Sequence, residues 1–330
     1  MPNDRLRLAD FAPSRRPGRY RVTATVDANP SVDLPILAIA GERPGPVFIA
    51  AAGVHGDEYE GPRALWEVCA ALPPSSLSGV FVALPVCNPW AYGAASRATP
   101  VHLDGVNLAR TFPGDPAGSP TQRLAAALLA FIIRLRPALF LDLHSGGVRY
   151  RFLPAVAYRR GLGDAARSRA AARAFGVPTL WAGRDHVGTF NAETARRGIT
   201  TVGNEMTGAG GCLDADVAAD REGVLNLMRW LGMLRDRPAP EAPGAFWETA
   251  EVPAGRGGYV EMRCSIGDTV SAGVPLGVVR SPFGEVVDEA RAPYDGAVWV
   301  TRHLRMLEAG EVIGAVARPV PDDASPDAGD

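Results

Sequence analysis

A histidine and a glutamate three residues apart, His55 and Glu58, lie in a glycine-flanked segment at residues 53–61. The segment follows the apolar run of residues 46–52, which predicts a buried strand, so the histidine and the glutamate fall in the turn after it. Such a turn lets two side chains converge on one metal ion. A polar surface turn could have the same composition, so a third ligand is needed to favour a metal site.

The third candidate ligand is His144, at the carboxyl end of an apolar strand predicted at residues 138–143. Ligands of open α/β sheets bind beyond the carboxyl ends of the strands, so His144 is expected at the same rim as His55. Catalytic zinc sites recurrently use two histidines and a glutamate and leave one position for water, a set that includes Glu58 here. Asp142 shares the strand face of His144, so it could orient a ligand imidazole or instead cap a neighbouring loop.

Hydrolysis at such a site also needs a base for the attacking water and a positive group for the developing oxyanion. Glu205 follows the strand predicted at residues 199–203 and is a candidate base, or else a solvated loop carboxylate. Arg97 and Arg110 lie in the long loop of residues 87–118, where a guanidinium could polarise a carbonyl or grip a carboxylate, or could be a surface residue. Of the remaining histidines, His102 and His186 lie in loops, where they could contact the substrate or be merely exposed, and His303 is expected at the surface.

Alternating apolar strands and amphipathic helices must position these residues. They predict an α/β fold, with a mostly parallel mixed sheet and helices on both faces. Strands are expected at residues 19–26 (an edge strand), 34–40, 46–52, 79–86, 138–143, 152–157, 179–182 and 199–203. Helices are expected at residues 62–72, 119–136, 163–175, 191–197 and 216–235.

The chain divides into segments of different composition. Residues 1–18 read as a loose polar lead-in and residues 19–236 as the catalytic α/β domain. Residues 237–244 form a stiff proline-rich linker. Residues 245–318 contain short β-type runs separated by glycines, which predicts a small all-β domain, and residues 319–330 are expected to be a disordered tail.

The composition excludes several classes of function. The net charge of −2 and the pI near 6.2 argue against nucleic acid or an anionic membrane as a partner. All 34 basic residues are arginine, which excludes Schiff-base and P-loop chemistry. The sequence contains neither a signal-peptide pattern nor an apolar run long enough for a membrane span, so a cytoplasmic location is expected.

Five motifs in order resemble the succinylglutamate desuccinylase/aspartoacylase family, a branch of the zinc carboxypeptidase-like fold. They are the turn at residues 53–58, Asn88-Pro89 together with Arg97, residues 104–114 with Asn107 and Arg110, the segment 142–144, and Glu205. The match runs through the large predicted domain. The small C-terminal β domain is also a feature of this family, in which it narrows the entrance to the active site.

The resemblance implies a role for each matched residue. One Zn²⁺ per chain is bound by His55, Glu58 and His144, and Glu205 acts as general base and then acid. Arg97 polarises the amide carbonyl, while Arg110, with Asn107 beside it, contacts the substrate carboxylate. The implied activity is a zinc-dependent amidohydrolase that removes an acetyl or succinyl group from a small N-acylated amino acid.

The substrate is less defined than the reaction. Many relatives have Asn-Leu-Asn-Arg where this chain has Ala109 in the third position, so an amide that helps hold the substrate carboxylate is missing. The long form of the first motif looks most like the branch that deacetylates N-acetyl-2,4-diaminobutyrate. A zinc carboxypeptidase and a non-catalytic ligand-binding protein are the alternatives, and assembly into a homo-oligomer stays open.

Overall fold

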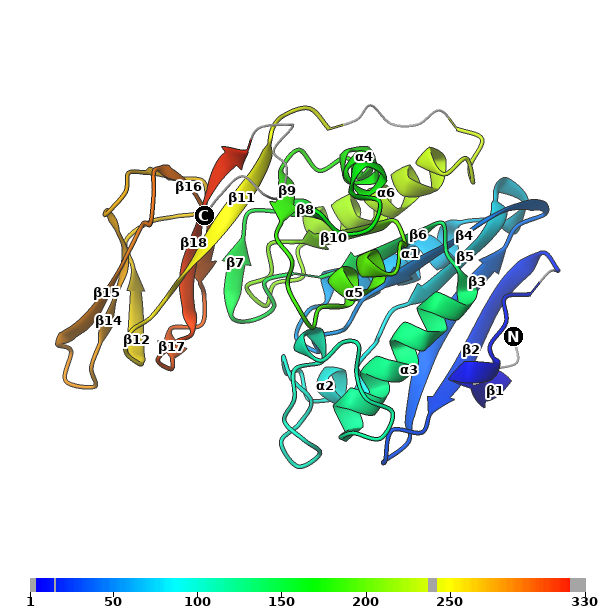
Figure 1. Cartoon of the computed structure of the whole chain (residues 1–330), viewed down its shortest axis with the longest axis horizontal. Coiled ribbons are helices and arrows are strands. Elements are labelled where there is room, and N and C mark those ends of the chain that lie inside the picture. The colour runs from blue at the N-terminus through cyan, green and yellow to red at the C-terminus, as the bar shows by residue number, and fades with distance from the viewer. Residues whose placement is uncertain (1–3, 15, 237–241, 321–330) are drawn as a thin grey trace.

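A long twisted sheet runs through the whole molecule in the computed structural model, which describes residues 4–14, 16–236 and 242–320 (Figure 1). Its strands follow the order β1-β2-β3-β5-β4-β6-β10-β8-β9-β11-β18-β16-β13, and β7 pairs with β16. The strands of the N-terminal part are β1 (Asp4–Arg7), β2 (Gly18–Val26), β3 (Val32–Ala40), β4 (Arg43–Ala51), β5 (Ser78–Leu84), β6 (Leu139–Leu143), β7 (Tyr150–Phe152), β8 (Ala155–Arg159), β9 (Leu180–Gly183) and β10 (Thr201–Glu205). The neighbours β5, β4, β6 and β10 are mutually parallel, whereas β8 runs antiparallel to β10, so the predicted mixed sheet is confirmed.

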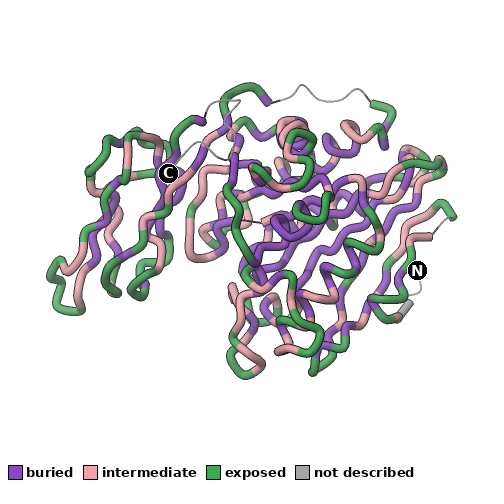
Figure 2. Tube along the Cα trace, viewed as in Figure 1, coloured by how far each residue is buried: buried purple, intermediate pink, exposed green. Residues whose placement is uncertain are grey.

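Helices cover both faces of this sheet, as the sequence predicts. The helices are α1 (Glu60–Ala71), α2 (Pro89–Gly93), α3 (Pro120–Leu135), α4 (Ala165–Phe175), α5 (Phe190–Arg196) and α6 (Asp214–Trp230). Alternate residues of β4 face opposite layers: Phe48 packs in the core with α1, α4 and α6, whereas Ile49 packs in the core with α3 and α5. These two cores bury the central strands on both sides (Figure 2).

The long loop between β5 and α3 is ordered by its own polar contacts. It contains α2, whose N-cap Asn88 accepts a hydrogen bond from the Ala91 N–H at 3.2 Å and donates to Thr99 at 3.1 Å. At its other end, Asp104 accepts hydrogen bonds from the backbone N–H of Thr121 at 2.7 Å and from Ser119 at 2.9 Å. The loop is therefore fixed against the first turn of α3.

The C-terminal strands continue the main sheet and do not stand apart from it. They are β11 (Phe246–Pro253), β12 (Gly258–Met262), β13 (Thr269–Val270), β14 (Pro275–Arg280), β15 (Val286–Arg291), β16 (Gly296–Arg302), β17 (Met306–Leu307) and β18 (Val312–Val320). Strand β11 pairs in parallel with β9, and β7 pairs with β16, so two strand pairings among the described residues join this region to the α/β part (Figure 1). A second sheet of four strands, β15-β14-β12-β17, lies beyond them.

The structure corrects the expectations for both ends of the chain. Residues 4–7, expected in a loose lead-in, form β1 and pair in parallel with β2, so β2 is not an edge strand. Pro319 and Val320, expected in a disordered tail, pair with Trp247 and Phe246 as the end of β18. Short local sequence patterns did not predict these two strand segments, because their backbone hydrogen bonds come from pairing with a strand distant in the sequence. The rest of the predicted tail, 321–330, and linker residues 237–241 lie outside the described residues.

Phe246 provides a test of the junction between the two regions. It is 1% exposed, its ring lies 5.1 Å from that of Tyr158, and it starts the strand that pairs with β9. Phe246→Ala should lower the free energy of unfolding by about 3–5 kcal/mol, because a large aromatic side chain is lost from a packed site. Phe283→Ala is the matched control: Phe283 is 91% exposed, so its loss should cost about 0.5 kcal/mol or less. Denaturant unfolding measures both, and equal effects would contradict the proposed junction.

Candidate active site

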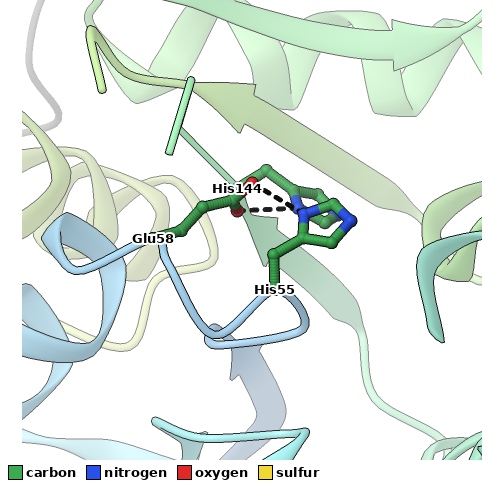
Figure 3. A group of neighbouring side chains, drawn as sticks. All are labelled: His55, Glu58 and His144. Atoms are coloured by element: carbon green, nitrogen blue, oxygen red, sulfur yellow. Dashed lines mark hydrogen bonds and ion pairs between the residues drawn. The ribbon is translucent and has the colours of Figure 1, made fainter. Parts of the chain in front are cut away.

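Three neighbouring parallel strands end at one rim and bring the candidate ligands together. The turn after β4 carries His55 and Glu58, the residue after β6 is His144, and β10 ends at Glu205. One ligand atom from each of His55, Glu58 and His144 can be chosen so that all three lie within 4.8 Å of one another (Figure 3). The centroids of the two imidazole rings are 4.9 Å apart. The structure thus assembles the three residues that the sequence predicted as ligands.

The hydrogen bonds of His55 determine which ring nitrogen carries its proton. Oδ1 of Asn107 accepts the backbone N–H of Ala109 at 2.9 Å, which fixes the orientation of the amide. The same oxygen lies 3.1 Å from Nε2 of His55, so Nε2 must be the protonated donor. Nδ1 of His55 then presents a lone pair toward Oε1 of Glu58, only 2.6 Å away. Two acceptors at this distance need a shared proton or a cation between them.

His144 presents its ring in the same way. Its Nδ1 lies 3.1 Å from Oε2 of Glu58, and its Nε2 lies 3.4 Å from the Asp142 carboxylate. Asp142 is fully buried and neither of its oxygens has a hydrogen-bond partner among the described residues. The Asp142 carboxylate therefore faces the outer nitrogen of His144.

Burial and charge shift the pKa values of these groups in opposite directions. Burial lowers the pKa of His55 to about 4, so this ring is neutral at pH 7 and keeps a lone pair for a metal ion. Burial also opposes protonation of His144, but the charges of Asp142 and Glu58 outweigh it and raise the pKa of His144. For Glu58, burial favours the neutral form, yet the two histidines dominate and lower its pKa.

The ligand turn is held by close backbone packing. The Gly56 N–H donates to the Ser96 carbonyl at 2.8 Å, and the Asn88 N–H donates to the Gly53 carbonyl at 2.9 Å. A Cβ atom on Gly56 would lie 2.0 Å from the backbone of Ala91 in α2. Gly53 has φ +59°, a left-handed conformation that glycine adopts without steric cost. Residues flanking His55 are thus glycine because the loop lies directly against them.

A cavity adjoins the candidate ligands and extends toward the C-terminal strands. Its lining combines polar side chains with apolar ones that include Trp181, Trp299 and Val300. Small residues on one sheet face also line it, Ala155, Ala157 and Gly203. The further polar lining residues are Arg97, Asn107, Arg110, Arg159, His186, Asn191, Glu205 and Glu251.

Glu205 lines this cavity, and its carboxylate is not engaged by other described side chains. None of the described residues forms a hydrogen bond or ion pair with its carboxylate. Burial raises the pKa of Glu205 to about 8. A carboxyl group that titrates near neutral pH is suited to both accepting and donating a proton.

The two predicted arginines also reach the cavity. Nη1 of Arg97 donates to Oε1 of Glu58 at 3.3 Å, so Arg97 lies beside the candidate metal ligands. Nη1 of Arg110 donates to the carbonyl of Ala109 at 2.9 Å. Ala109 itself is 1% exposed and packs in the core beside α3, so it does not line the cavity. The side chain at position 109 therefore does not face the cavity.

Several lining residues were not found by sequence reasoning. Arg159 and Asn191 line the cavity from the α/β part, and Trp299 and Glu251 line it from the C-terminal strands. His186 is exposed as expected but also lines the cavity, whereas His102 and His303 are exposed outside it. The alternation Ala155, Ala157, Arg159 on one strand face was the available signal, because small residues there leave room above the sheet.

Comparison with known proteins gives the family. Residues 44–231, more than half of the chain, match the model of the succinylglutamate desuccinylase/aspartoacylase catalytic domain. The chain belongs to this family. The resemblance read from the motifs and the fold class are confirmed.

Individual family members align over almost their full length. The N-alpha-acetyl-L-2,4-diaminobutyric acid deacetylase of Halomonas elongata is 28% identical over 341 residues, which covers 93% of this chain and 98% of the relative. A solved succinylglutamate desuccinylase/aspartoacylase from Rhodobacter sphaeroides has a TM-score of 0.83 at 28% identity, with 94% and 98% covered. The product-bound ectoine utilization protein EutE (DoeB) of Ruegeria pomeroyi has a TM-score of 0.84 at 27% identity, with 93% and 97% covered.

Gly56 offers a test of how the turn supports the site. In Gly56→Ala the new methyl group would overlap the Ala91 backbone, which should cost about 1–3 kcal/mol of stability and displace His55 from Glu58. We expect a smaller rise in melting temperature on addition of Zn²⁺ than in the wild type. Gly93→Ala, in the adjacent α2, is the control because a Cβ there meets no atom within 4 Å. Thermal unfolding with and without Zn²⁺ measures this rise in both variants. An equal rise in melting temperature in both would contradict a role for the packing at Gly56.

Proposed function

We propose that this protein is a zinc-dependent amidohydrolase that removes an acetyl or succinyl group from a small N-acylated amino acid. The observation that carries the proposal is the close approach of Nδ1 of His55 to a Glu58 oxygen, at 2.6 Å, beside Nδ1 of His144. Ligand atoms of the three side chains lie within 4.8 Å of one another, and Asn107 and Asp142 face the outer nitrogens of the two rings. Family membership supports the same reading.

The donor set fits zinc. Two imidazole nitrogens and a carboxylate are ligands that Zn²⁺ takes in hydrolases, and three protein ligands leave a position open. A possible acceptor faces the outer nitrogen of each imidazole, Asn107 at 3.1 Å and Asp142 at 3.4 Å, and such an acceptor orients a metal-binding imidazole and raises the basicity of its ligating nitrogen. When bound by His55, Glu58 and His144, zinc would act as a Lewis acid and lower the pKa of water toward neutral pH.

The chain's own residues then divide the work of amide hydrolysis. Glu205 takes a proton from the attacking water as the water oxygen bonds to the carbonyl carbon, and it returns the proton to the amine nitrogen as the C–N bond breaks. Arg97 donates a hydrogen bond to the carbonyl oxygen, where negative charge develops. Arg110 holds the carboxylate of the amino acid. The products are a free amino acid and the acid of the acyl group.

Within this class we favour N-acetyl-2,4-diaminobutyrate as the substrate. The relative from Halomonas elongata that matches almost the whole chain carries that name. Among the described residues, Glu205 and Glu251 are the carboxylates that line the cavity. With Glu205 engaged at the amide, Glu251 is placed to attract the side-chain ammonium of such a substrate.

Removal of the metal should abolish activity. We expect a chelator to stop hydrolysis of N-acetyl and N-succinyl amino acids, followed by mass spectrometry, and stoichiometric Zn²⁺ to restore it. A panel of these compounds together with tripeptides identifies the substrate class. Full hydrolysis by the metal-free protein would contradict zinc dependence, and cleavage of tripeptides alone would favour a carboxypeptidase.

Replacement of the proposed base should separate chemistry from metal binding. Glu205→Gln is expected to lower kcat by about 10²–10⁴-fold, since the amide cannot accept the proton of water. Zinc content, measured by mass spectrometry of the purified protein, should be unchanged because Glu205 is not a ligand. Glu261→Gln, in the four-stranded sheet that adds no residue to the cavity, serves as the control and should retain activity. An unchanged kcat in Glu205→Gln would argue against the base.

A further inference from the structure

Arg159 is a buried cation in the cavity that forms no ion pair with a described residue. It is 8% exposed at the end of β8, and it lines the cavity together with Asn191 and Glu205. Nε donates to Oδ1 of Asn191 at 2.9 Å and Nη1 donates to the carbonyl of Arg184 at 3.1 Å. No acceptor for Nη2, and no ion pair, is found for Arg159 in the described part of the chain. One edge of the guanidinium is therefore left for a ligand.

A purely structural role does not account for this residue. The two acceptors that it contacts are neutral, so an uncharged donor would satisfy both without the cost of burying a charge. Burial lowers the pKa of Arg159 to about 10, partly offset by the charges of Asp142 and Glu205, so the side chain stays cationic at pH 7. A charge kept in the wall of a cavity calls for an anion in the cavity.

The surrounding backbone makes room for this arginine and its amide partner. A Cβ on Gly183 would lie 2.7 Å from Nη1 of Arg159, and a Cβ on Gly203 would lie 2.9 Å from Nδ2 of Asn191. The Thr189 hydroxyl lies within hydrogen-bond distance of the same Asn191 oxygen, at 3.0 Å, and of the His186 carbonyl, at 2.9 Å. Two strands and the start of α5 thus form a fitted pocket for the guanidinium.

Arg110, like Arg159, is a positive charge that no described residue pairs with a negative one. It lines the same cavity, hydrogen-bonds to the neutral carbonyl of Ala109, and forms no ion pair with a described residue. Arg110 and Arg159 are close enough for their charges to interact. A substrate with negative charge would relieve this repulsion, whereas a neutral one would not.

We propose that Arg159, positioned by Asn191, is a carboxylate-binding residue of the cavity. This inference rests on the proposed function, in which the ligand is an N-acyl amino acid. The carboxylate has two sources: the α-carboxylate of the amino acid, shared with Arg110, or a second carboxylate in the side chain or the acyl group. Both present the same planar acceptor to the guanidinium.

Ligand binding tests the proposal without turnover. Binding would be measured by calorimetry in zinc-loaded Glu205→Gln protein, with N-acetylalanine, N-acetylaspartate, N-succinylalanine and the carboxamide of N-acetylalanine. Adding Arg159→Gln should weaken carboxylate binding about 10- to 100-fold and leave the carboxamide unchanged. Arg159→Lys, which keeps the charge, should restore part of the loss and provides the measurement if the glutamine variant does not fold. Arg160→Gln is the matched control, because Arg160 pairs with Glu248 outside the cavity.

The pattern of losses identifies the source of the carboxylate. A loss on N-acetylalanine assigns Arg159 to the α-carboxylate, and a loss confined to the two dicarboxylates assigns it to the second one. If the Arg159 variants bind the acids as tightly as their parent does, the inference is overturned. It is also overturned if the parent binds none of the acids. Absence of hydrolysis by the wild type, with carboxylate-dependent binding intact, would overturn the proposed function alone.

Discussion

The register of three adjacent parallel strands is the constraint on which the site depends. Asp142 of β6 lies opposite Ala51 of β4 on one side and Gly203 of β10 on the other. Because the strands run the same way, the residues that follow each of them emerge at one rim, where a His-x-x-Glu turn, a histidine and a glutamate meet. A shift of one residue in any pair would turn the side chains to the opposite face. The two hydrophobic layers fix that register, since each strand face has its own core.

The sheet does not stop at the α/β part, and its continuation shapes the cavity. Pairing of β11 with β9 and of β7 with β16 brings Trp299 and Val300 into the same cavity lining as the small residues Ala155 and Ala157. Side chains from both parts of the sheet thus line one cavity next to the ligand cluster. No helix in the described residues is both long and apolar enough to cross a membrane.

The site contains charged and ligating groups that the protein alone does not pair with a group of opposite charge. Nδ1 of His55 and Nδ1 of His144 both face the Glu58 carboxylate, an arrangement that a bound cation would stabilise. In the same cavity, Arg110 and Arg159 carry positive charge with no carboxylate partner among the described residues. The ligand cluster thus attracts a cation and the two arginines an anion, and an acylated amino acid in the cavity would contact both.

The sequence by itself determined the residues whose role follows from local pattern. A buried strand followed by a His-x-x-Glu turn, and a second strand ending in His144, are short-range signals, because strand direction and strand end are fixed by the few residues around them. Tertiary structure decided everything that depends on distant partners. Strand β1 exists only through its pairing with β2, Asn107 proved to orient His55, and Ala109 proved to lie in the core. Arg159 became visible only when Asn191, Gly183 and the C-terminal strands enclosed it, since burial and the lack of a counterion are properties of the folded chain.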